Sequence, residues 1–432
     1  MKKRILYIHH GRGIGGAPLS LLFLIRKLEA SKYYPIVLCL CESPAADLYR
    51  DEGIETCIAK GIHSFSHTYL TWYNYRRLWD LIWRSLAFLP SVYGTYRLVK
   101  THKPDLVHLN SSTLAPCAIG AKLAGAPVVW HIREPIHSGY FGVRKWLLRR
   151  CIHKFADRVV AICQSDADQL INSDKIKVVY NFVDFNQFNK HIPGDGFRKE
   201  FGLDNGLKAI GMFGGVAITK GTLEFVKAAK MLKERIETAK FFVVGSLPTI
   251  LRPEPVEGLC PEPACPERSR RVEGVQAQDI KQGLKKVVKK ILGVRDYYGE
   301  IETVIESAGL GEDIIFTGVR QDIPGILAGM DLVIFPSTVP HFGRPIIEAG
   351  AMAKPVVASD LDGPRELVVD GETGLLVAAK NPKALAEAII EILSDEQLAR
   401  RMGEAGYHRA RKLFNAEMNA RQTFEVYEEL CT

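Results

Sequence analysis

The chain has 432 residues, of which 47% are hydrophobic and 25% are charged, and its formal net charge is +8. This length and composition describe a soluble globular enzyme of about two domains. The positive charge is modest and dispersed, so it does not indicate a nucleic-acid partner. No uncharged segment reaches the roughly 20 residues that a bilayer span needs. The N-terminal MKKRILYIHH contains only a strand-length apolar run, and we expect no signal peptide there.

The nine cysteines are scattered along the chain. None belongs to a C-x-x-C pair or stands next to a plausible histidine ligand. This distribution indicates a reduced cytoplasmic protein, and we expect no metal site.

A glycine-rich loop, HHGRGIGG, separates a first strand at 4–8 from a helical pattern at 17–28. Such a loop lets another molecule approach the backbone closely. The G-x-G-x-x-G register fails and no acidic residue ends the next strand, so the loop is not a dinucleotide fingerprint. Its glycines, Gly15 and Gly16 among them, belong either to a ligand-binding loop or to a tight turn between strand and helix.

Residues 63–100 combine three tryptophans with five basic residues and a single acid, Asp80. Trp72, Trp79 and Trp83 fall near one face of a predicted helix. Such a helix suits an anionic membrane surface or a lipid-linked acceptor. The alternative, which we favour here, is a helix packed in the N-terminal domain with its basic residues solvated. A second basic run at 144–154 contains no acid and adds some weight to the membrane interpretation.

Strand-like runs end at Asn110 and near Glu134, and they alternate with helical patterns. The alternation predicts a parallel sheet with helices on both faces. His131 and Glu134 therefore fall at the carboxyl end of a strand, where such sheets bind ligands. Further strands near 156–165 and 176–184 complete a first domain, and a polar linker follows.

The second half of the chain begins with a strand from Ala209, a glycine loop that includes Gly215, and the pair Lys220-Gly221 before a helix. After a strand at 241–245 the periodicity disappears over a segment rich in Pro, Glu and Arg. We expect 247–296 to be an irregular or disordered insertion. The helix and strand pattern resumes at 297, and helices at 382–394 and 396–430 close the chain.

The segment 331–359 predicts a strand at 331–335, a loop, a helix from Ile346 that Lys354-Pro355 ends, and a strand from Val356. The helix contains one acid, Glu348. The free N–H groups at the start of this helix suit a phosphate. One turn later, the Glu348 carboxylate is placed to accept hydrogen bonds from two sugar hydroxyls. The alternative is a solvated acid that follows an ordinary loop.

The sequence HFGRPIIEAGAMAKPVVAS resembles the donor-site signature of the retaining nucleotide-sugar glycosyltransferases of family four, which have the GT-B fold. The resemblance implies that Glu348 binds the nucleotide ribose. Pro340 stands where the family has a first glutamate near the donor sugar. By the same resemblance, His131 in HIRE hydrogen-bonds the sugar or its leaving phosphate, and Gly15-Gly16 flank the donor phosphates and the acceptor.

Lys220-Gly221 resemble the end of a second family motif, in which an arginine and a lysine grip the donor diphosphate. Gly215 stands in the arginine position, and Arg344 is a candidate replacement cation. The expected donor-binding residues are Gly15, Gly16, Gly215, Lys220, Phe342, Gly343, Arg344, Pro345, Ile346 and Glu348, with His131 and Glu348 as the catalytic pair.

The expected architecture is α/β of the GT-B type, with two Rossmann-like domains that face a central cleft. Residues 1–190 form the acceptor-side domain and 207–412 the nucleotide-sugar domain. A C-terminal helix within 413–432 crosses back to the first domain.

The resemblance implies a retaining hexosyltransferase of polysaccharide biosynthesis, which needs no cofactor or metal and takes a nucleotide-diphosphate sugar as co-substrate. The acceptor would be a glycan or a lipid-linked molecule, and the protein would be cytoplasmic or peripheral at the inner face of an anionic membrane. Pro340 and Gly215 keep two alternatives open, namely a nucleotide-sugar-binding protein without turnover and a sugar-nucleotide epimerase.

Overall fold

The computed structural model describes residues 2–11, 13, 15–65, 82–138, 142–203, 206–236, 238–246 and 297–431. The chain folds into two compact units, Met1–Ile192 with Pro340–Leu376 and Glu396–Thr432, and Pro193–Val339 with Val377–Asp395. The expected insertion at 247–296 lies outside the described residues, as do Trp72 and Trp79.

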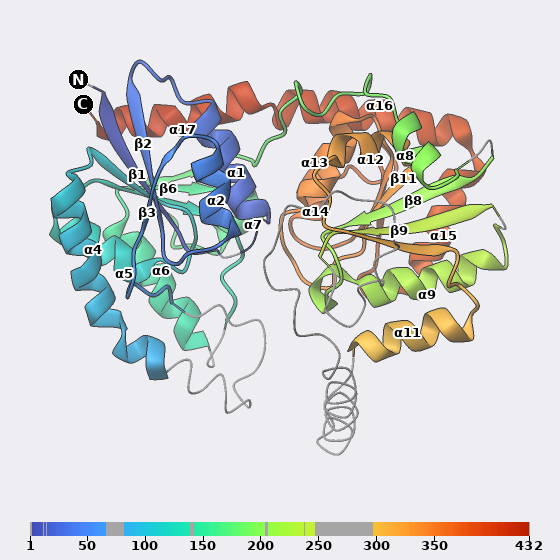
Figure 1. Ribbon diagram of the computed structural model, residues 1–432, viewed down its shortest axis with the longest axis horizontal. Coiled ribbons are helices and arrows are strands. Elements are labelled where there is room, and N and C mark those ends of the chain that lie inside the picture. The colour runs from blue at the N-terminus through green and yellow to red at the C-terminus, as the bar shows by residue number, and fades with distance from the viewer. Residues whose placement is uncertain are drawn as a thin grey trace, which may run out of the picture. The chain divides into compact units, whose positions relative to one another are not determined.

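The first unit contains a seven-stranded parallel sheet of order β3-β2-β1-β4-β5-β6-β7 (Figure 1). Its strands are β1 (Lys3–His9), β2 (Tyr33–Cys39), β3 (Glu55–Ile58), β4 (Leu106–Leu109), β5 (Val128–Ile132), β6 (Arg158–Ala161) and β7 (Ile176–Val178). Strand β1 pairs Leu6 with Ile36 of β2 and with Val107 of β4. The middle strands are buried on both faces, which is why their sequences read as continuous apolar runs.

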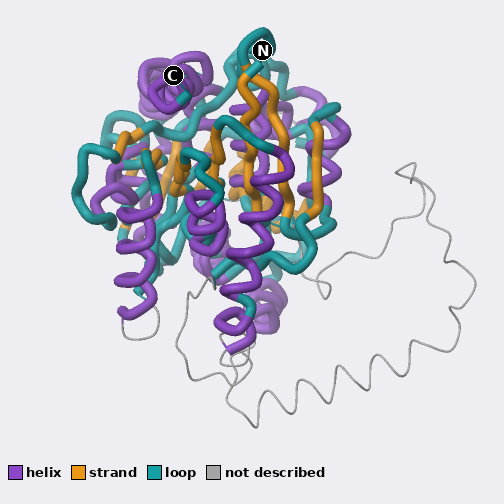
Figure 2. The backbone as a smooth tube through the Cα atoms, turned by 90° about the vertical axis from the view of Figure 1, so that its left-hand side faces the viewer, coloured by secondary structure: helices purple, strands orange, loops and turns teal. Residues whose placement is uncertain are grey.

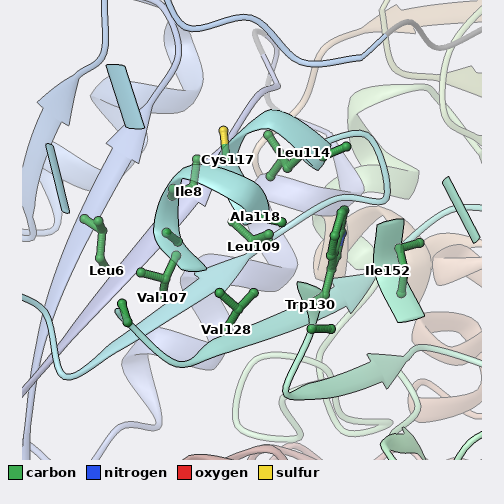
Figure 3. Close-up of a cluster of buried hydrophobic side chains, with 14 of the residues drawn as sticks. Leu6, Ile8, Val107, Leu109, Leu114, Cys117, Ala118, Val128, Trp130 and Ile152 are labelled. Atoms are coloured by element: carbon green, nitrogen blue, oxygen red, sulfur yellow. The ribbon is translucent and has the colours of Figure 1, made fainter. Parts of the chain in front are cut away.

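Helices cover both faces of this sheet (Figure 2). They are α1 (Gly16–Arg26), α2 (Pro44–Asp51), α4 (Phe88–His102), α5 (Ala115–Leu123), α6 (Val143–Phe155) and α7 (Gln164–Asp168). Side chains of α4, α5 and α6 pack on one face, against Leu6, Leu109 and Trp130 (Figure 3). Side chains of α1 and α2 pack on the other face, around Ile5 and Tyr7.

The second sheet has the order β10-β9-β8-β11-β12-β13. Its strands are β8 (Lys208–Phe213), β9 (Ala239–Val244), β10 (Ile314–Gly318), β11 (Leu332–Phe335), β12 (Val356–Ser359) and β13 (Leu375–Val377). The helical segments of this half are α8 (Asp195–Glu200), η2 (Ile218–Lys220), α9 (Thr222–Lys233), α11 (Tyr297–Ser307), α12 (Ile323–Gly329), α13 (Arg344–Ala351), α14 (Pro364–Leu367) and α15 (Pro382–Ser394). In the second unit, α9 packs against α11 and α15. The two Rossmann-like folds predicted from the sequence are therefore confirmed.

The helical pattern at 396–430 forms two helices, α16 (Glu396–Leu413) and α17 (Ala416–Leu430). The break occurs at Asn415, whose side chain caps α17 by accepting a hydrogen bond from the Glu417 N–H at 2.9 Å. On α17, Tyr427 is fully buried, and its hydroxyl lies 2.7 Å from His108 Nδ1 on β4. This contact confirms the predicted return of the C-terminal helix to the first sheet.

None of the helices in the described part of the chain combines the length and the apolar composition that crossing a membrane requires.

Helices α4 and α5 approach each other closely because Gly120 has no side chain. A Cβ atom at Gly120 would lie 2.4 Å from the Val92 carbonyl oxygen and 2.7 Å from Thr95 Cβ. A methyl group at this point must push the two helices apart.

We predict that Gly120→Ala lowers the free energy of unfolding by about 1–3 kcal/mol, as overpacking of a close contact does. The measurement is urea unfolding, with Gly16→Ala on α1 as the control, since a Cβ at Gly16 meets nothing within 4 Å. Equal unfolding midpoints for Gly120→Ala and the wild type would contradict the close approach.

Candidate functional site

The loop between β11 and α13 delivers the predicted motif to the start of a buried helix. Gly343 is the N-cap residue of α13, and Pro345 lies in its first turn. The helix therefore begins at Arg344, two residues earlier than the predicted start at Ile346, because proline suits the first helical turn. Phe342 and Ile346 are buried on either side of this start. Pro340, earlier in the loop, supplies no carboxylate.

Glu348 is buried, with 8% of its surface exposed, and pairs with the arginine one turn before it. Arg344 Nε donates to Glu348 Oε1 at 2.6 Å. The second carboxylate oxygen accepts no hydrogen bond from the described residues. Burial raises the pKa of Glu348, and the adjacent Arg344 opposes that rise. Glu348 is thus a buried acid with one oxygen held and one oxygen open.

Arg344 also joins α13 to α1, the helix that follows the glycine-rich loop. Its Nη1 donates to Ser20 Oγ at 3.0 Å, and its guanidinium lies 4.9 Å from the centre of the Phe23 ring. Its Nη2 is buried and has no hydrogen-bond partner among the described residues. The structure therefore brings Arg344 and Glu348 together with the helix that begins at Gly16.

Gly15 and Gly16 form the start of α1, as the N-cap residue and the first helical residue. Both are exposed, and a Cβ atom at either would meet nothing within 4 Å. The internal packing of the described chain thus does not require glycine at these positions. The first turn of α1 contains no acidic residue, so its N–H groups and the helix dipole favour an anion.

His131 is the fourth of the five residues of β5, so it lies at the carboxyl end of the strand. It is buried, and its Nδ1 lies 3.2 Å from His108 Nε2. His108 Nδ1 in turn contacts the Tyr427 hydroxyl, so the three side chains form one chain of hydrogen bonds. His131 Nε2 is buried and has no partner among the described residues.

Burial, Arg133 and His108 lower the pKa of His131 well below its ordinary value, so the ring is neutral near pH 7. The direction of the hydrogen-bond chain then fixes its tautomer. When Tyr427 donates to His108, His108 donates to His131 Nδ1 and His131 Nε2 carries a proton to donate. When the chain runs the other way, His131 Nε2 is an acceptor. Either state offers a ligand hydroxyl one hydrogen bond.

The sequence interpretation did not single out Arg133, which directly follows β5. Its Nε donates to Asn110 Oδ1 and its Nη1 to Asn181 Oδ1 at 2.8 Å. Asn110 ends one predicted strand-like run and Arg133 lies next to the end of the following one, and that position was the available signal. Glu134 accepts hydrogen bonds from the Ser111 hydroxyl at 2.5 Å and from the Ser112 N–H and hydroxyl at 2.8 Å.

In the second unit, Gly215 lies in a turn that hydrogen-bonds to the end of β9. Its N–H donates to the Val244 carbonyl at 3.0 Å, and its φ angle is +75°. A Cβ atom at Gly215 would lie 2.4 Å from the Ser246 carbonyl oxygen. This backbone excludes an arginine at position 215, which explains why the chain departs from the family motif there.

Lys220 ends the short helix η2, and the α-helix α9 begins two residues later. Its Nζ lies 6.0 Å from the centre of the Phe335 ring, and burial lowers its pKa. Gly221, between the two helices, has a φ of +74°, and a Cβ there would meet the Pro336 carbonyl oxygen at 1.7 Å. Lys220 is thus a partly buried cation on a turn that only glycine can complete.

Comparison with known proteins adds to this geometry. A family model described as "Glycosyltransferase Family 4" matches residues 14–187, and one described as "Glycosyl transferases group 1" matches residues 276–409. The chain is 35% identical over 136 residues to the lipopolysaccharide core biosynthesis mannosyltransferase LpsB of Rhizobium meliloti, a match that covers 31% of this chain and 39% of that relative. The match thus spans about two fifths of the length of this relative.

A longer match, 24% identical over 327 residues and 72% of each chain, is to the Escherichia coli UDP-Gal:alpha-D-GlcNAc-diphosphoundecaprenol alpha-1,3-galactosyltransferase. Among solved structures, Anabaena HepE in complex with UDP and glucose superposes with a TM-score of 0.74 over 99% of both chains, at 23% identity. At this identity, the structural likeness establishes the fold.

The buried histidines of the first unit predict a loss of stability in acid. Burial lowers the pKa values of His108 and His131, and lowers that of His9 to about 3. As the pH falls through about 6.5, the unfolded chain binds protons that the native rings exclude, so native stability decreases. Each neutral ring then lowers the free energy of unfolding by about 1.4 kcal/mol between pH 7.5 and pH 5.5.

We therefore expect the free energy of unfolding of His108→Gln to fall by about 1.4 kcal/mol less than that of the wild type over this pH range. The measurement is urea unfolding at both pH values, and the comparison concerns the difference between them, so a general loss of stability does not affect it. His153→Gln, at an exposed position, is the control. The same pH dependence in His108→Gln and the wild type would show that His108 takes up a proton in the native state as readily as in the unfolded chain, which would contradict this prediction.

Proposed function

We propose that this chain transfers a sugar from a nucleotide-diphosphate sugar to a glycan or lipid-linked acceptor, with retention of the anomeric configuration. The chain belongs to the group 1 glycosyltransferases, and its N-terminal half is of the family four type. The observation that carries the proposal is the buried carboxylate of Glu348, which has one oxygen held by Arg344 and one open. A buried carboxylate is costly unless it is hydrogen-bonded. Two ribose hydroxyls would supply the missing donors.

Donor binding would use the elements around this carboxylate. In the proposal, Glu348 binds the ribose, and the loop of Phe342, Gly343, Pro345 and Ile346 contacts the nucleotide. Gly15 and Gly16 leave space for a ligand beside the free N–H groups of α1, which suits phosphate oxygens. The UDP complex of HepE, a protein of the same fold, supports a nucleotide in this role.

The departing diphosphate needs positive charge, because negative charge grows on it as the glycosidic bond breaks. We propose that Lys220 supplies this charge together with Arg344, since position 215 cannot hold an arginine. Two fixed cations remove the need for a divalent metal, and the transfer would then need no cofactor. His131 would hold the donor sugar through Nε2, as a hydrogen-bonding group rather than a base, because its pKa is strongly lowered.

Transfer is better supported than the alternatives of binding without turnover or epimerisation. Both relatives reported above are named as transferases, one of lipopolysaccharide core biosynthesis and one that acts on a diphosphoundecaprenol-linked sugar. By analogy, the product would belong to polysaccharide biosynthesis.

The proposal predicts that release of nucleotide diphosphate depends on an acceptor. We expect the purified protein to release nucleotide diphosphate from one nucleotide sugar only when a lipid-linked or glycan acceptor is present, with an α-linked product from an α-linked donor. Liquid chromatography measures the nucleotide, and NMR of the anomeric proton gives the configuration. Acceptor-independent release, or a sugar epimer without transfer, would contradict the proposal.

The second prediction is that the transfer rate depends on Lys220 and does not depend on a divalent metal. Lys220→Gln should reduce the transfer rate by at least tenfold, because a cation worth about 1.4 kcal/mol in the transition state is lost. Addition of EDTA should leave the rate unchanged. The matched control is Lys227→Gln, which removes a lysine that pairs with Glu300 on the outer helices α9 and α11. A rate that falls with EDTA and returns with Mg²⁺ would contradict the metal-free proposal.

We further propose that the first unit binds the inner face of an anionic membrane, where a lipid-linked acceptor would lie. Trp83, Leu86 and Leu89, which precede or begin α4, are 61%, 70% and 74% exposed. On α6, Trp146 and Leu147 are 52% and 42% exposed. Helix α5 packs against both α4 and α6, so the two apolar patches flank one helix.

Basic groups accompany the apolar side chains on α6. Lys145, Arg149 and Arg150 line a pocket of about 340 Å³ together with Trp146, and the Arg150 guanidinium lies 4.6 Å from the Trp146 ring centre. Exposed aromatic side chains beside cations suit the interface of a bilayer that contains anionic lipids.

We predict that the protein co-floats with phosphatidylglycerol vesicles at low salt and much less with phosphatidylcholine vesicles. Replacing Trp146 and Leu147 with serine should abolish this binding, whereas Met418→Ser, at an exposed position on α17, should not. Equal recovery with both kinds of vesicle, or no effect of the double substitution, would contradict the membrane surface.

A further inference from the structure

Arg133 is a cation without a carboxylate partner in the described part of the chain. It is only partly exposed, and desolvation lowers its pKa to about 10. Its hydrogen bonds go to two neutral amide oxygens, on Asn110 and Asn181. A guanidinium has five N–H donors, and these bonds use two of them, so three remain for a ligand.

The hydrogen bonds of the nearby acids go to other groups, although the charge of Glu134 also acts on Arg133. Glu134 is held by Ser111 and Ser112, and Glu348 pairs with Arg344. Taking a cation out of water without a counter-ion costs several kcal/mol, and amide oxygens compensate only in part. This desolvation cost arises at the carboxyl end of β5, where α/β sheets bind ligands.

The hydrogen bonds of Arg133 also fix the state of His9. Because Asn110 Oδ1 faces Arg133, its Nδ2 faces His9 Nδ1, at 3.1 Å. The neutral His9 ring must therefore accept at Nδ1 and carry its proton on Nε2. This Nε2–H is buried and has no partner among the described residues. Gly11 lies so close that a Cβ atom there would be 2.6 Å from Nε2.

Two of the groups coupled electrostatically to Arg133 are donors that lack partners; the others include Tyr49, Tyr427 and Glu134, which have hydrogen-bond partners of their own. Arg133 contributes to the lowered pKa of His9, and Arg344 contributes to the lowered pKa of Arg133. His9 Nε2 and Arg344 Nη2 are both buried without a hydrogen-bond partner among the described residues. Unpaired N–H donors around two cations suit an anion and disfavour a neutral or cationic ligand.

We infer that Arg133, with His9 and Arg344 beside it, forms a binding site for a phosphate group of a substrate. The planar guanidinium fork matches two phosphate oxygens, which a lysine at this point would not. The inference rests on the proposed function for its biological ligand, since the phosphate would belong either to the donor diphosphate or to a phosphorylated acceptor.

The test measures ligand-induced stabilisation and needs no transfer activity. The thermal midpoint of the full-length protein is followed against the concentration of inorganic phosphate, pyrophosphate and the nucleotide diphosphate that binds best, with sodium chloride holding the ionic strength constant. The variants are Arg133→Gln and Arg133→Lys. The control is Arg158→Gln, which removes an arginine paired with Glu429 on α17.

We expect saturable stabilisation of the wild type by phosphate or pyrophosphate, weakened at least tenfold in Arg133→Gln, partly restored in Arg133→Lys and unchanged in Arg158→Gln. If Arg133→Gln also loses nucleotide-diphosphate binding, the site holds the donor phosphates. If that binding persists, the site holds an acceptor phosphate. Retention of the wild-type phosphate response in Arg133→Gln, or a response that sodium chloride reproduces, would overturn the inference.

The two proposals fail separately. Phosphate binding through Arg133 can be absent while donor-dependent transfer is present, in which case only the phosphate site is wrong. A protein that binds phosphate at Arg133 and transfers no sugar would instead disprove the proposed function.

Discussion

The buried ion pair between Arg344 and Glu348 is the interaction on which the candidate donor site depends. A cation in the first turn of a helix is opposed by the helix dipole, and a carboxylate inside a protein is opposed by desolvation. Placed one turn apart at 2.6 Å, the two groups compensate each other. Ser20 and the Phe23 ring hold the other side of the guanidinium, so the pair also ties α13 to α1. Glu348 is thereby kept in place with one oxygen open.

A second cluster of buried polar side chains lies at the carboxyl ends of β1, β4 and β5. His9, His108 and His131 are neutral there because desolvation disfavours their charged forms, and Arg133 reinforces this effect on each ring. Neutral imidazoles suit hydrogen bonds to sugar hydroxyls, which are weak dipoles, whereas the charged Arg133 suits a phosphate. The same edge of the sheet thus offers two kinds of recognition, and the connected hydrogen bonds through Asn110 and Tyr427 orient both.

Much of this arrangement could be predicted from the sequence because the parallel strands are buried runs and their ends carry polar residues. The strand before the Glu348 helix, the helix itself and the following strand were predicted within about two residues. The ion pair between Glu348 and Arg344 was not predicted, because only a helix that begins at Arg344 puts the two side chains on one face.

Other features depend on contacts between distant segments, which no local pattern records. The importance of Arg133 became visible only when Asn110 and Asn181 proved to be its partners, 23 and 48 residues away. Gly215 was read as a lost arginine, and the positive φ and the Ser246 carbonyl supply the physical reason. The roles of the site residues and the predicted domain limits stay predictions.

The central claim is that Glu348 binds the ribose of a donor nucleotide, and calorimetric titration tests it most directly. UDP, GDP and ADP would be titrated into the wild type, Glu348→Gln and the control Glu391→Gln, which lies exposed on α15. We predict that one nucleotide binds the wild type and the control equally, and binds Glu348→Gln at least tenfold more weakly, a difference of about 1.4 kcal/mol. Binding of the same nucleotide with equal affinity to a folded Glu348→Gln, or no binding of any nucleotide to the wild type, would contradict the claim.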